Sequence, residues 1–538
     1  MSEGLATTFH LLAGTSNEAA VRALTAVLDS PLEPVRRRAL EALITRRSSG
    51  GKREVLARFE QLDERGLEYF KQNANRMAAT LRAALLDADD PLRGNACRAT
   101  LLLGEVDLIP ALVGALDNAH GPLADELAAA LIELAQRLAT QLLASDDTPG
   151  RRDPQTIRST VLGALERAVR GYRAQDRPEL VEAFLLLTPA DNVVLQELLA
   201  SSANRAVAVL ADQFTHHPHP AAMDLVLNLL DEPKPAAAVI GAVARRRDLE
   251  FARRLLQKVG EHPTRTLRHN LRRIRSLACL QNDLTAIDQL DEPQQAAAIE
   301  LTVLTSIPRD EAFRVVQHLL LHGLPAARQA AARALEEFNG TAANDLAVQA
   351  LDDPDPHVQA RILAHIRRRG IPGILPRLVD KAESPHEVVR AAAQETLAEF
   401  SFKRYWGAFD MLEDDVRRTT GKMVRKIDPY AVPLLQQYLA DAGRGNRLRA
   451  IEVAVTLQLV PTLEDRLIEM LDDEDHIIRH RVVAALAHVV SPTSEAALRA
   501  ALEDPSETVR QAARSSLDER RLFDQWQQVW ESPKEAAP

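Results

Sequence analysis

A turn that recurs about every 30 residues constrains this chain more than any other feature. The stretches LDDPDPHVQARI at 351, LDDEDHIIRHRV at 471 and LEDPSETVRQAA at 502 show it most clearly, and looser copies begin at 28, 86, 230 and 290. Aligned on the position after the first apolar residue beyond the turn, the copies lie 27 to 32 residues apart. A period of this size predicts a solenoid of stacked units. The aligned positions are Ala208, Ala238, Arg268, Ala298, Arg328, Gln359, Arg390, Arg417, Arg449, Arg479 and Arg510.

Each unit is predicted to be a pair of helices. A first helix ends at the acidic turn, and a second one follows, as in VRQAARSSL at 509, with apolar residues at i, i+3, i+4 and i+7. Acidic residues and Ser or Thr before the second helix can cap its free N–H groups, and Pro in its first turn costs no hydrogen bond. Aromatic residues are only 4% of the chain, which favours helices over strands. We therefore expect an all-α fold, an α-α superhelix of helix pairs.

The turn and the second helix follow the pattern L-x-D-x-x-x-x-V-R-x-x-A-A-x-A-L, best seen in PLEPVRRRALEAL (31–43), HEVVRAAAQETL (386–397) and SETVRQAARSSL (506–517). This pattern resembles the short bacterial HEAT-like repeat, the type also found in phycobilisome lyases. The resemblance covers nearly the whole chain and is weak between 140 and 200. It implies a right-handed, armadillo-like superhelix. It says less about function, because HEAT-like arrays are mostly binding scaffolds and only some belong to enzymes.

One polar segment interrupts the repeats. ASDDTPGRRDPQT, 144–156, is rich in Asp, Pro, Gly and Arg and is predicted to be an exposed loop. It could be a hinge between N-terminal repeats over 1–143 and a C-terminal array with a capping helix over 157–530, or an inserted loop in one continuous solenoid. Near the end, Phe523, Trp526 and Trp530 share one helix face that would cover the last repeat, and a tail follows at 531–538.

The repeated turn also brings together residues that bind metals elsewhere. Asp352, Asp353, Asp355 and His357 lie within six positions, but the Gly and Glu of a calcium-binding loop are missing at the sixth and twelfth positions from Asp353. Because related turns have these acids scrambled or missing, we interpret them as turn and cap residues. The Arg that follows the Val in the pattern can bond the acidic turn of its own or an adjacent unit, which would form a ladder along the array.

A histidine cluster is the other candidate metal site. THHPHP (215–220) contains His216, His217 and His219, but the segment itself has no Cys or carboxylate to complete a closed site. We interpret the segment as a solvated turn between helices. No metal and no cofactor is expected.

Residues 245–275 carry a strong positive charge. They contain eleven Lys and Arg but three Asp and Glu, a local balance of +8 in a chain whose net charge is −10. Arg265, Arg268, Arg272 and Arg275 step by 3, 4 and 3 residues, which predicts one stripe along a helix. In the family that the chain resembles, the second helix lines the concave face, so the stripe could contact an anionic partner. The alternative is a solvated helix flank whose arginines pair with acidic neighbours.

The segment 399–430 departs most from the repeat and is the best candidate for a partner-binding patch. Five aromatic residues fall within ten positions, and the repeat step shortens to 27. Exposed Tyr, Trp and Arg make good interface anchors, whereas the same rings, if buried, would fill a bend in the solenoid. The candidate binding residues are Phe402, Lys403, Arg404, Tyr405, Trp406, Phe409, Arg417 and Arg418.

The leading hypothesis is a non-enzymatic scaffold that binds protein partners along its concave surface. The sequence has no P-loop, G-x-G-x-x-G, H-E-x-x-H or G-x-S-x-G motif, so we expect no catalysis. One alternative is an accessory or lyase-like protein of the phycobilisome-lyase type. Another is a binder of nucleic acid or a different anionic partner through 245–275, although the negative net charge argues against nucleic acid.

The composition also bears on the compartment. Cys97 and Cys279 are the only cysteines, too far apart for metal-type spacing and too few for a disulfide framework, which fits a reducing environment. The N-terminal residues show no signal-peptide pattern, and we expect no membrane span. A cytoplasmic protein is predicted.

Overall fold

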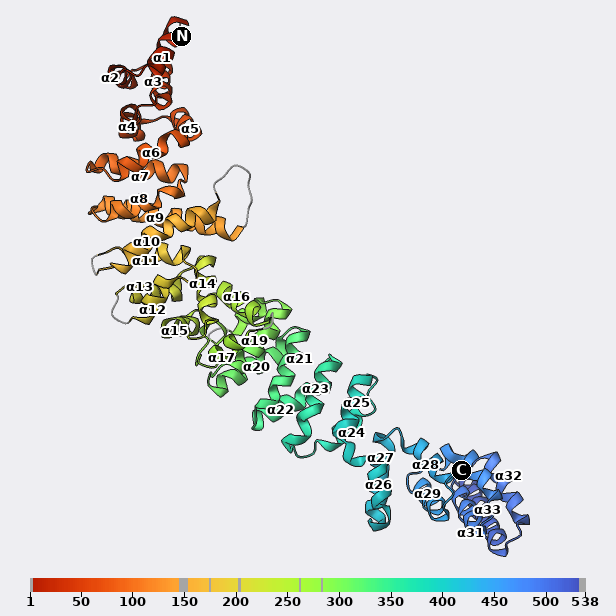
Figure 1. Cartoon of the computed structure of the whole chain (residues 1–538). Helices are drawn as coiled ribbons and strands as arrows, with labels where there is room; N and C mark the ends of the chain where they lie inside the picture. The colour runs from red at the N-terminus through yellow and green to blue at the C-terminus, as the bar shows by residue number, and fades with distance from the viewer. Residues whose placement is uncertain are drawn as a thin grey trace, which may run out of the picture. The chain divides into compact units, whose positions relative to one another are not determined.

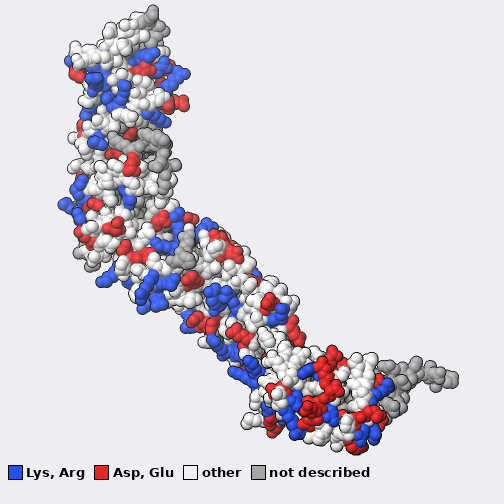
Figure 2. Space-filling model, turned by 45° about the vertical axis from the view of Figure 1, so that its right-hand side comes forward, with Lys and Arg blue, Asp and Glu red and all other residues white. Residues whose placement is uncertain are grey.

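The computed structural model describes residues 3–144, 153–173, 176–201, 205–260, 263–281 and 284–531, with side chains from 4 to 520 within these ranges. The described residues form helices and no strand, and helices that follow one another in the chain pack as neighbours (Figure 1). The predicted all-α solenoid of helix pairs is thereby confirmed. The chain divides into two compact units, Met1–His318 and Leu319–Pro538. Basic and acidic side chains are interspersed over the face shown in Figure 2.

In part of the first unit, helices two apart in the chain pack on each other. Helices α7, α9, α11, α13 and α15 thereby form one row of the solenoid. The helices of this unit are α1 (Glu3–Gly14), α2 (Ala19–Leu28), α3 (Glu33–Thr45), α4 (Ser49–Ala57), α5 (Glu64–Gln72), α6 (Ala74–Leu85), α7 (Asp90–Leu103), α8 (Ile109–Leu116), α9 (Pro122–Ala144), α10 (Pro154–Arg170), α11 (Pro178–Leu187), α12 (Val193–Ala200), α13 (Ala206–His216), α14 (Pro220–Leu230), α15 (Ala237–Arg245), α16 (Leu249–Gly260), α17 (Arg265–Leu271), α18 (Ala278–Gln281) and α19 (Glu292–Leu304).

Helix α20 (Arg309–His322) spans the boundary between the two units. In the second unit the same alternation holds, with α21 packed on α23, α23 on α25, α29 on α31 and α31 on α33. The helices here are α21 (Pro325–Ala334), α22 (Thr341–Ala350), α23 (Pro356–Ile366), α24 (Leu375–Lys381), α25 (Glu387–Thr396), α26 (Phe402–Ala408), α27 (Asp414–Ile427), α28 (Ala431–Leu439), α29 (Arg444–Thr456), α30 (Glu464–Glu469), α31 (His476–Leu486), α32 (Pro492–Ala500) and α33 (Glu507–Glu531).

Short 3-10 helices tighten many of the turns between these helices. They are η1 (Phe59–Gln61), η2 (Val106–Leu108), η3 (Leu284–Gln289), η4 (Leu335–Glu337), η5 (Arg367–Arg369), η6 (Ala398–Phe400), η7 (Phe409–Met411), η8 (Pro461–Leu463), η9 (Met470–Asp472) and η10 (Ala501–Glu503).

The predicted loop at 144–156 separates α9 from α10, and its residues 145–152 lie outside the described part. Helix α10, which follows the loop, packs against α8, α9 and α11 within the first unit. The hinge and the inserted loop both stay predictions. The side chains of Phe523, Trp526 and Trp530, and residues 532–538 of the predicted tail, also lie outside the described part.

One described helix, α9, is long and apolar enough to cross a membrane by length and composition. Its 23 residues include nine buried ones, and it packs against α7, α8 and α11. A core helix of a helical array passes the same test of length and composition, because both are rich in apolar residues.

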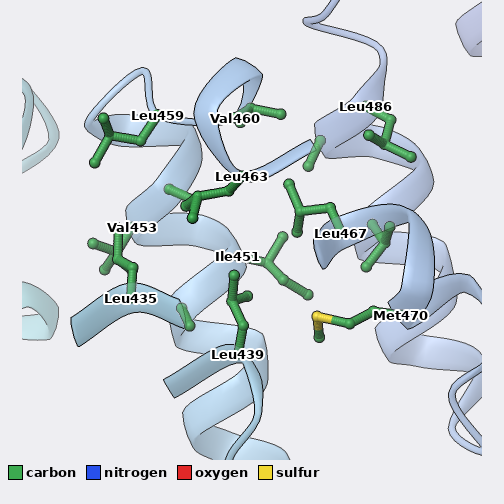
Figure 3. Close-up of a cluster of buried hydrophobic side chains, with 14 of the residues drawn as sticks. Leu435, Leu439, Ile451, Val453, Leu459, Val460, Leu463, Leu467, Met470 and Leu486 are labelled. Atoms are coloured by element: carbon green, nitrogen blue, oxygen red, sulfur yellow. The ribbon is translucent and has the colours of Figure 1, made fainter. Parts of the chain in front are cut away.

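The core of each unit lies between its helices and consists mainly of Leu, Val, Ile and Ala. Figure 3 shows one such region of the second unit, in which side chains from α28, α29, α30 and α31 point toward one another. The residues labelled there are Leu435, Leu439, Ile451, Val453, Leu459, Val460, Leu463, Leu467, Met470 and Leu486. Because each layer fills the space between consecutive pairs, a single pair buries its apolar face only when the next pair is present.

An arginine near the start of the second helix joins neighbouring acidic turns. Arg479 donates from Nη1 to the carbonyl of Asp473, six residues earlier in its own turn, at 2.8 Å. Its Nε and Nη2 donate to both carboxylate oxygens of Asp504, in the turn of the next unit, at 2.8 and 2.9 Å. Asp504 also accepts from the backbone N–H of Ser506 at 2.7 Å, which fixes its own turn. One side chain therefore holds two turns together through charge-assisted hydrogen bonds.

Arg447 repeats both contacts and other residues make one of them, which agrees with the predicted bonding to the turn of the same or an adjacent unit. Arg328 pairs with Asp353 and Arg447 with Asp473, each at 3.1 Å. The bond to the carbonyl six residues earlier is also made by Arg36, Gln359, Arg390, Arg447 and Arg510.

The ladder corrects one position of the predicted register, because Arg447 takes the role assigned to Arg449. Arg449 instead pairs with Asp410, and its guanidinium lies 5.3 Å from the centroid of the Trp406 ring. The alignment rule selects the residue after the first apolar side chain. In this unit that side chain is Leu448, which comes late because the turn and the start of α29 are polar.

A second group of arginines reaches back to the preceding unit. Arg246 is buried and donates from its two Nη atoms to the carbonyls of Phe214 and His217, both at 2.8 Å, where α13 ends. The last carbonyls of a helix have no partner within that helix, so these bonds satisfy groups that are otherwise unpaired. The arginines with corresponding contacts to carbonyls about one unit earlier are Arg46, Arg369 and Arg520.

We predict that replacing Arg479 by Leu destabilises the C-terminal repeats by about 3 kcal/mol, because Asp504 is left buried without its cation. Both side chains are well shielded, with 12% and 9% exposed. Hydrogen exchange of the full chain measures this effect as faster exchange of the α31 and α33 amides. Arg499→Leu is the control, since Arg499 is 66% exposed and, among the described residues, pairs only with Glu495 on its own helix. Equal effects of the two substitutions would contradict the prediction.

The ladder also predicts a loss of stability in acid. The hydrogen bond from Arg479 holds the pKa of Asp504 below its usual value, against burial, which raises it. A carboxyl with a lowered folded-state pKa stabilises the fold fully above its unfolded pKa of about 3.9, and loses this contribution as the pH falls through the folded value. We expect Asp504→Asn to lower Tm at pH 7. Between pH 7 and pH 3, the Tm of this variant should fall less than the Tm of the parent chain. Identical losses in the two proteins would exclude this role for Asp504.

Candidate functional site

A cavity of about 940 Å³ opens in the first unit where the C-terminal ends of α13 and α15 meet the starts of α16, α18 and α20. Its residues come from four successive segments of the repeat, between 215 and 314. It is lined by Thr215, His216, Pro218, Met223, Ala244, Arg245, Arg246, Arg247, Asp248, Glu250, Ser276, Ala278, Gln281, Glu311 and Arg314. A cavity of this volume is in the range that accommodates ligand groups or several side chains of a partner.

Buried Arg246 holds one wall of the cavity in place. In addition to the two carbonyls of α13, it donates from Nε to Asp248 at 2.9 Å, and its guanidinium lies 4.7 Å from the centroid of the Phe251 ring. Its flanking residues Arg245 and Arg247 are exposed. The triplet therefore has one arginine that fixes the backbone and two that are presented to the cavity.

The carboxylates that line the cavity already have partners. Asp248 accepts from Arg246, and Glu250 pairs with Arg254 of its own helix at 3.0 Å. Glu311 accepts a hydrogen bond from the side-chain amide of Gln281.

Three of the cavity's arginines, by contrast, have no carboxylate partner in the described part of the chain. Exposed Arg247 and Arg314 make no ion pair with any residue in the described part of the chain, and Arg245 donates only to the Thr215 hydroxyl, at 3.3 Å. The cavity therefore presents guanidinium donors that no carboxylate of the described chain contacts, a pattern that favours an anionic ligand group.

The predicted arginine stripe at 265–275 is only partly helical. Arg265 and Arg268 lie on α17, but this helix ends at Leu271, so Arg272 and Arg275 do not share its face, and this part of the prediction is wrong. The helix ends because the following unit takes its carbonyls: Ser306 donates from its hydroxyl to Arg272 O at 2.7 Å and from its backbone N–H to Ile274 O at 2.9 Å.

All four stripe arginines are nevertheless exposed and form no ion pair within the described ranges, so the alternative of a paired flank gains no support there. Arg275 directly precedes Ser276 of the cavity lining, and the basic stretch thus continues from the cavity into this irregular segment.

Most of the predicted aromatic patch is core, so the interface-anchor hypothesis is wrong for three of its rings. Phe402, Tyr405 and Phe409 are 0%, 3% and 1% exposed. The Tyr405 hydroxyl donates to the carbonyl of Arg417 at 2.9 Å, and burial raises the pKa of Tyr405 to about 12. The backbone N–H of Phe402 is bound by Asp428 at 2.7 Å. These contacts support the structural alternative, in which the rings pack the shortened repeat.

The remaining patch residues divide between packing and surface. Half-buried Trp406 stacks on Tyr438, with ring centroids 4.0 Å apart and an interplanar angle of 8°. Arg417 is committed internally: it donates to the carbonyls of Phe409 and Leu412, and its guanidinium lies 4.4 Å from the Phe409 centroid. The exposed members are Lys403, Arg404 and Arg418.

The histidine segment is not simply a solvated turn, because His217 is buried. Its Nε2 lies 3.1 Å from Glu182, and its Nδ1 accepts from the backbone N–H of His219. His219 in turn caps α14, and burial together with the neighbouring His217 lowers the pKa of His219. Only His216 is solvated, beside Asp212.

No group of three or more His, Cys, Asp or Glu residues in the described ranges could hold a metal ion. In the opening turn, Asp355 caps α23 through the N–H of His357, and Asp353 accepts from the N–H of Asp355. Asp352 pairs with Arg377 and Lys381 of α24. The interpretation of these acids as turn and cap residues is confirmed.

Comparisons with known proteins agree with the repeat. Residues 464–525 match a family model described as HEAT repeats, which confirms that part of the resemblance. The phycobilisome-lyase type stays a prediction. A search of curated proteins finds no match.

Similar solved structures are remote in sequence. A homology model of the full-length AP-3 complex matches at 12% identity over 95% of this chain and 93% of that chain, with a TM-score of 0.29. A chain from a structure of the phosphorylation-controlled interaction between cadherin and beta-catenin matches at 13% over 92% and 98%, with a TM-score of 0.29. Kap121p bound to Nup53p matches at 13% over 90% of this chain and 53% of that one, with a TM-score of 0.20, so this chain spans about half its length.

We predict that neither cysteine reacts in the native protein. Cys97 and Cys279 are buried, and burial raises the pKa of each thiol to about 12, so almost no thiolate is present at pH 8. Titration with a thiol-reactive disulfide reagent is expected to label both residues only after unfolding in guanidinium. Stoichiometric labelling of the folded chain would contradict the prediction.

Proposed function

We propose that this chain is a non-enzymatic scaffold that binds protein partners and that the arginine-lined cavity is one docking point on it. The observation that carries the proposal is that Arg247 and Arg314 have no carboxylate partner within the described chain, whereas the arginines of the ladder are bound internally. Repeat arrays bind through extended surfaces that their stacked units build, and such a surface needs no catalytic group.

The reactivity of the candidate nucleophiles supports a binding role. Both thiols are buried with a raised pKa, and both ring nitrogens of buried His217 are within hydrogen-bond reach of polar neighbours. With these groups occupied or inaccessible, the exposed chemistry of the cavity consists mainly of guanidinium, hydroxyl and amide donors. Such donors recognise and orient a partner. Free thiols also fit the cytoplasmic location that forms part of this proposal.

Site-specific photo-crosslinking in cells tests the scaffold proposal. We expect a benzoylphenylalanine placed at Ser276, an exposed residue of the cavity lining, to yield a discrete protein adduct that mass spectrometry identifies. The same probe at Lys71, exposed on α5, is the control and should not give this adduct.

The identified protein is then purified, and its binding to the full chain is measured. The proposal is supported if the Kd is higher for the chain substituted at Ser276 than for the parent chain. Adducts that contain no second protein, or an adduct partner that does not bind when purified, would reject it.

A further inference from the structure

We infer that the cavity binds an acidic peptide segment, with Asp or Glu side chains placed against Arg247 and Arg314. This inference rests on the proposed scaffold function and names the chemistry of the partner at that site. It starts from the balance of charges on the cavity wall. Every carboxylate in the lining has a partner within the described chain, whereas these two guanidinium groups have none.

Guanidinium and carboxylate are geometrically matched. The planar fork of Arg donates two parallel hydrogen bonds to the two oxygens of one carboxylate, as Arg479 and Asp504 already show in this chain. An acidic partner would thus extend to the cavity the same contact that joins the repeats.

The backbone that carries one of the two donors, Arg247, is fixed before a partner binds. The backbone that carries Arg245 and Arg247 is fixed by buried Arg246, which is bound to Phe214, His217 and Asp248. Because this wall is fixed before binding, less conformational entropy is lost when the ligand arrives.

The rest of the lining favours a peptide. Pro218, Met223, Ala244 and Ala278 contribute apolar surface beside the arginines, and a volume of about 940 Å³ has room for a few side chains. A segment in which acidic residues flank one apolar residue meets both kinds of surface. Such mixed apolar and charged contacts are typical of protein interfaces.

A nucleic acid fits this wall less well. The carboxylates of Asp248, Glu250 and Glu311 lie in the same lining, where they would repel a continuous phosphate backbone. Among the described residues, no Phe, Tyr or Trp lines the cavity to stack on a base.

Fluorescence anisotropy with the purified full chain tests the inference. The probe is a labelled peptide of about 12 residues made of Asp, Glu and Leu, measured at low salt, about 50 mM, where charge contacts are strongest. We expect saturable binding that weakens at least about tenfold in Arg247→Glu/Arg314→Glu, and that weakens further as salt is raised. Both residues are exposed, and circular dichroism verifies that the helices persist.

The matched control is Arg333→Glu/Arg361→Glu, which changes the net charge by the same amount at two exposed arginines of the second unit. It is expected to bind the peptide as the parent chain does. Two further probes are a peptide with Asn and Gln in place of the acids, and a single-stranded oligodeoxynucleotide of about 12 bases.

The inference is overturned if the acidic peptide does not bind, if the neutral peptide binds equally well, if the oligonucleotide binds more tightly, or if both double variants weaken binding alike. A partner crosslinked at 276 without any binding of the acidic peptide would leave the scaffold proposal intact and reject this inference alone. If no partner is crosslinked but the acidic peptide binds with the expected arginine dependence, the cavity chemistry stands and the scaffold proposal fails.

Discussion

The arginine that spans two repeats is the interaction on which the array depends. Apolar packing between helices is non-directional and tolerates sliding, so it does not by itself fix how one pair is placed on the next. Arg479 does fix it, because it must reach the carbonyl of Asp473 and both oxygens of Asp504 at once. Arg246 adds the complementary constraint at the other end of the second helix, where it binds the last carbonyls of the preceding unit.

This dependence explains why irregular segments occur where they do. Around α17 the ladder position is Arg268, which is exposed and makes no ion pair within the described ranges. In its place, buried Asn270 donates to the carbonyls of Leu230 and Glu232 at 2.8 Å each. The helix then stops, because Ser306 binds the carbonyls that would continue it. The cavity forms beside this interruption, where the lining includes Ser276 of the segment that follows α17.

The sequence was sufficient to predict the fold because the same turn and helix pattern occurs in many units. The period, the acidic turn and the arginine after it predicted helix pairs and the ladder. The register position Arg449 failed because the turn before α29 is polar, and Arg268 makes no ladder contact within the described ranges. The aromatic patch failed for a different reason: whether Tyr405 is an anchor or core depends on Arg417 O and on the neighbouring helices, which no local pattern encodes. The cavity was missed because its lining comes from segments up to about 100 residues apart, joined only by the stacking.

The RRR triplet at 245–247 shows what decides whether an arginine serves the fold or a partner. The donors of Arg246 are bound within the protein, because two helix-terminal carbonyls and Asp248 lie within its reach. The side chain is only 1% exposed. Arg245 and Arg247 have the same side chain, but the repeat supplies no second set of acceptors, so their donors face the cavity. The terminal carbonyls and the acidic turn of a unit can bind only a few guanidinium groups. Positive charge therefore becomes available to a partner where a unit has more arginines than these acceptors can bind, and 245–275 is such a place.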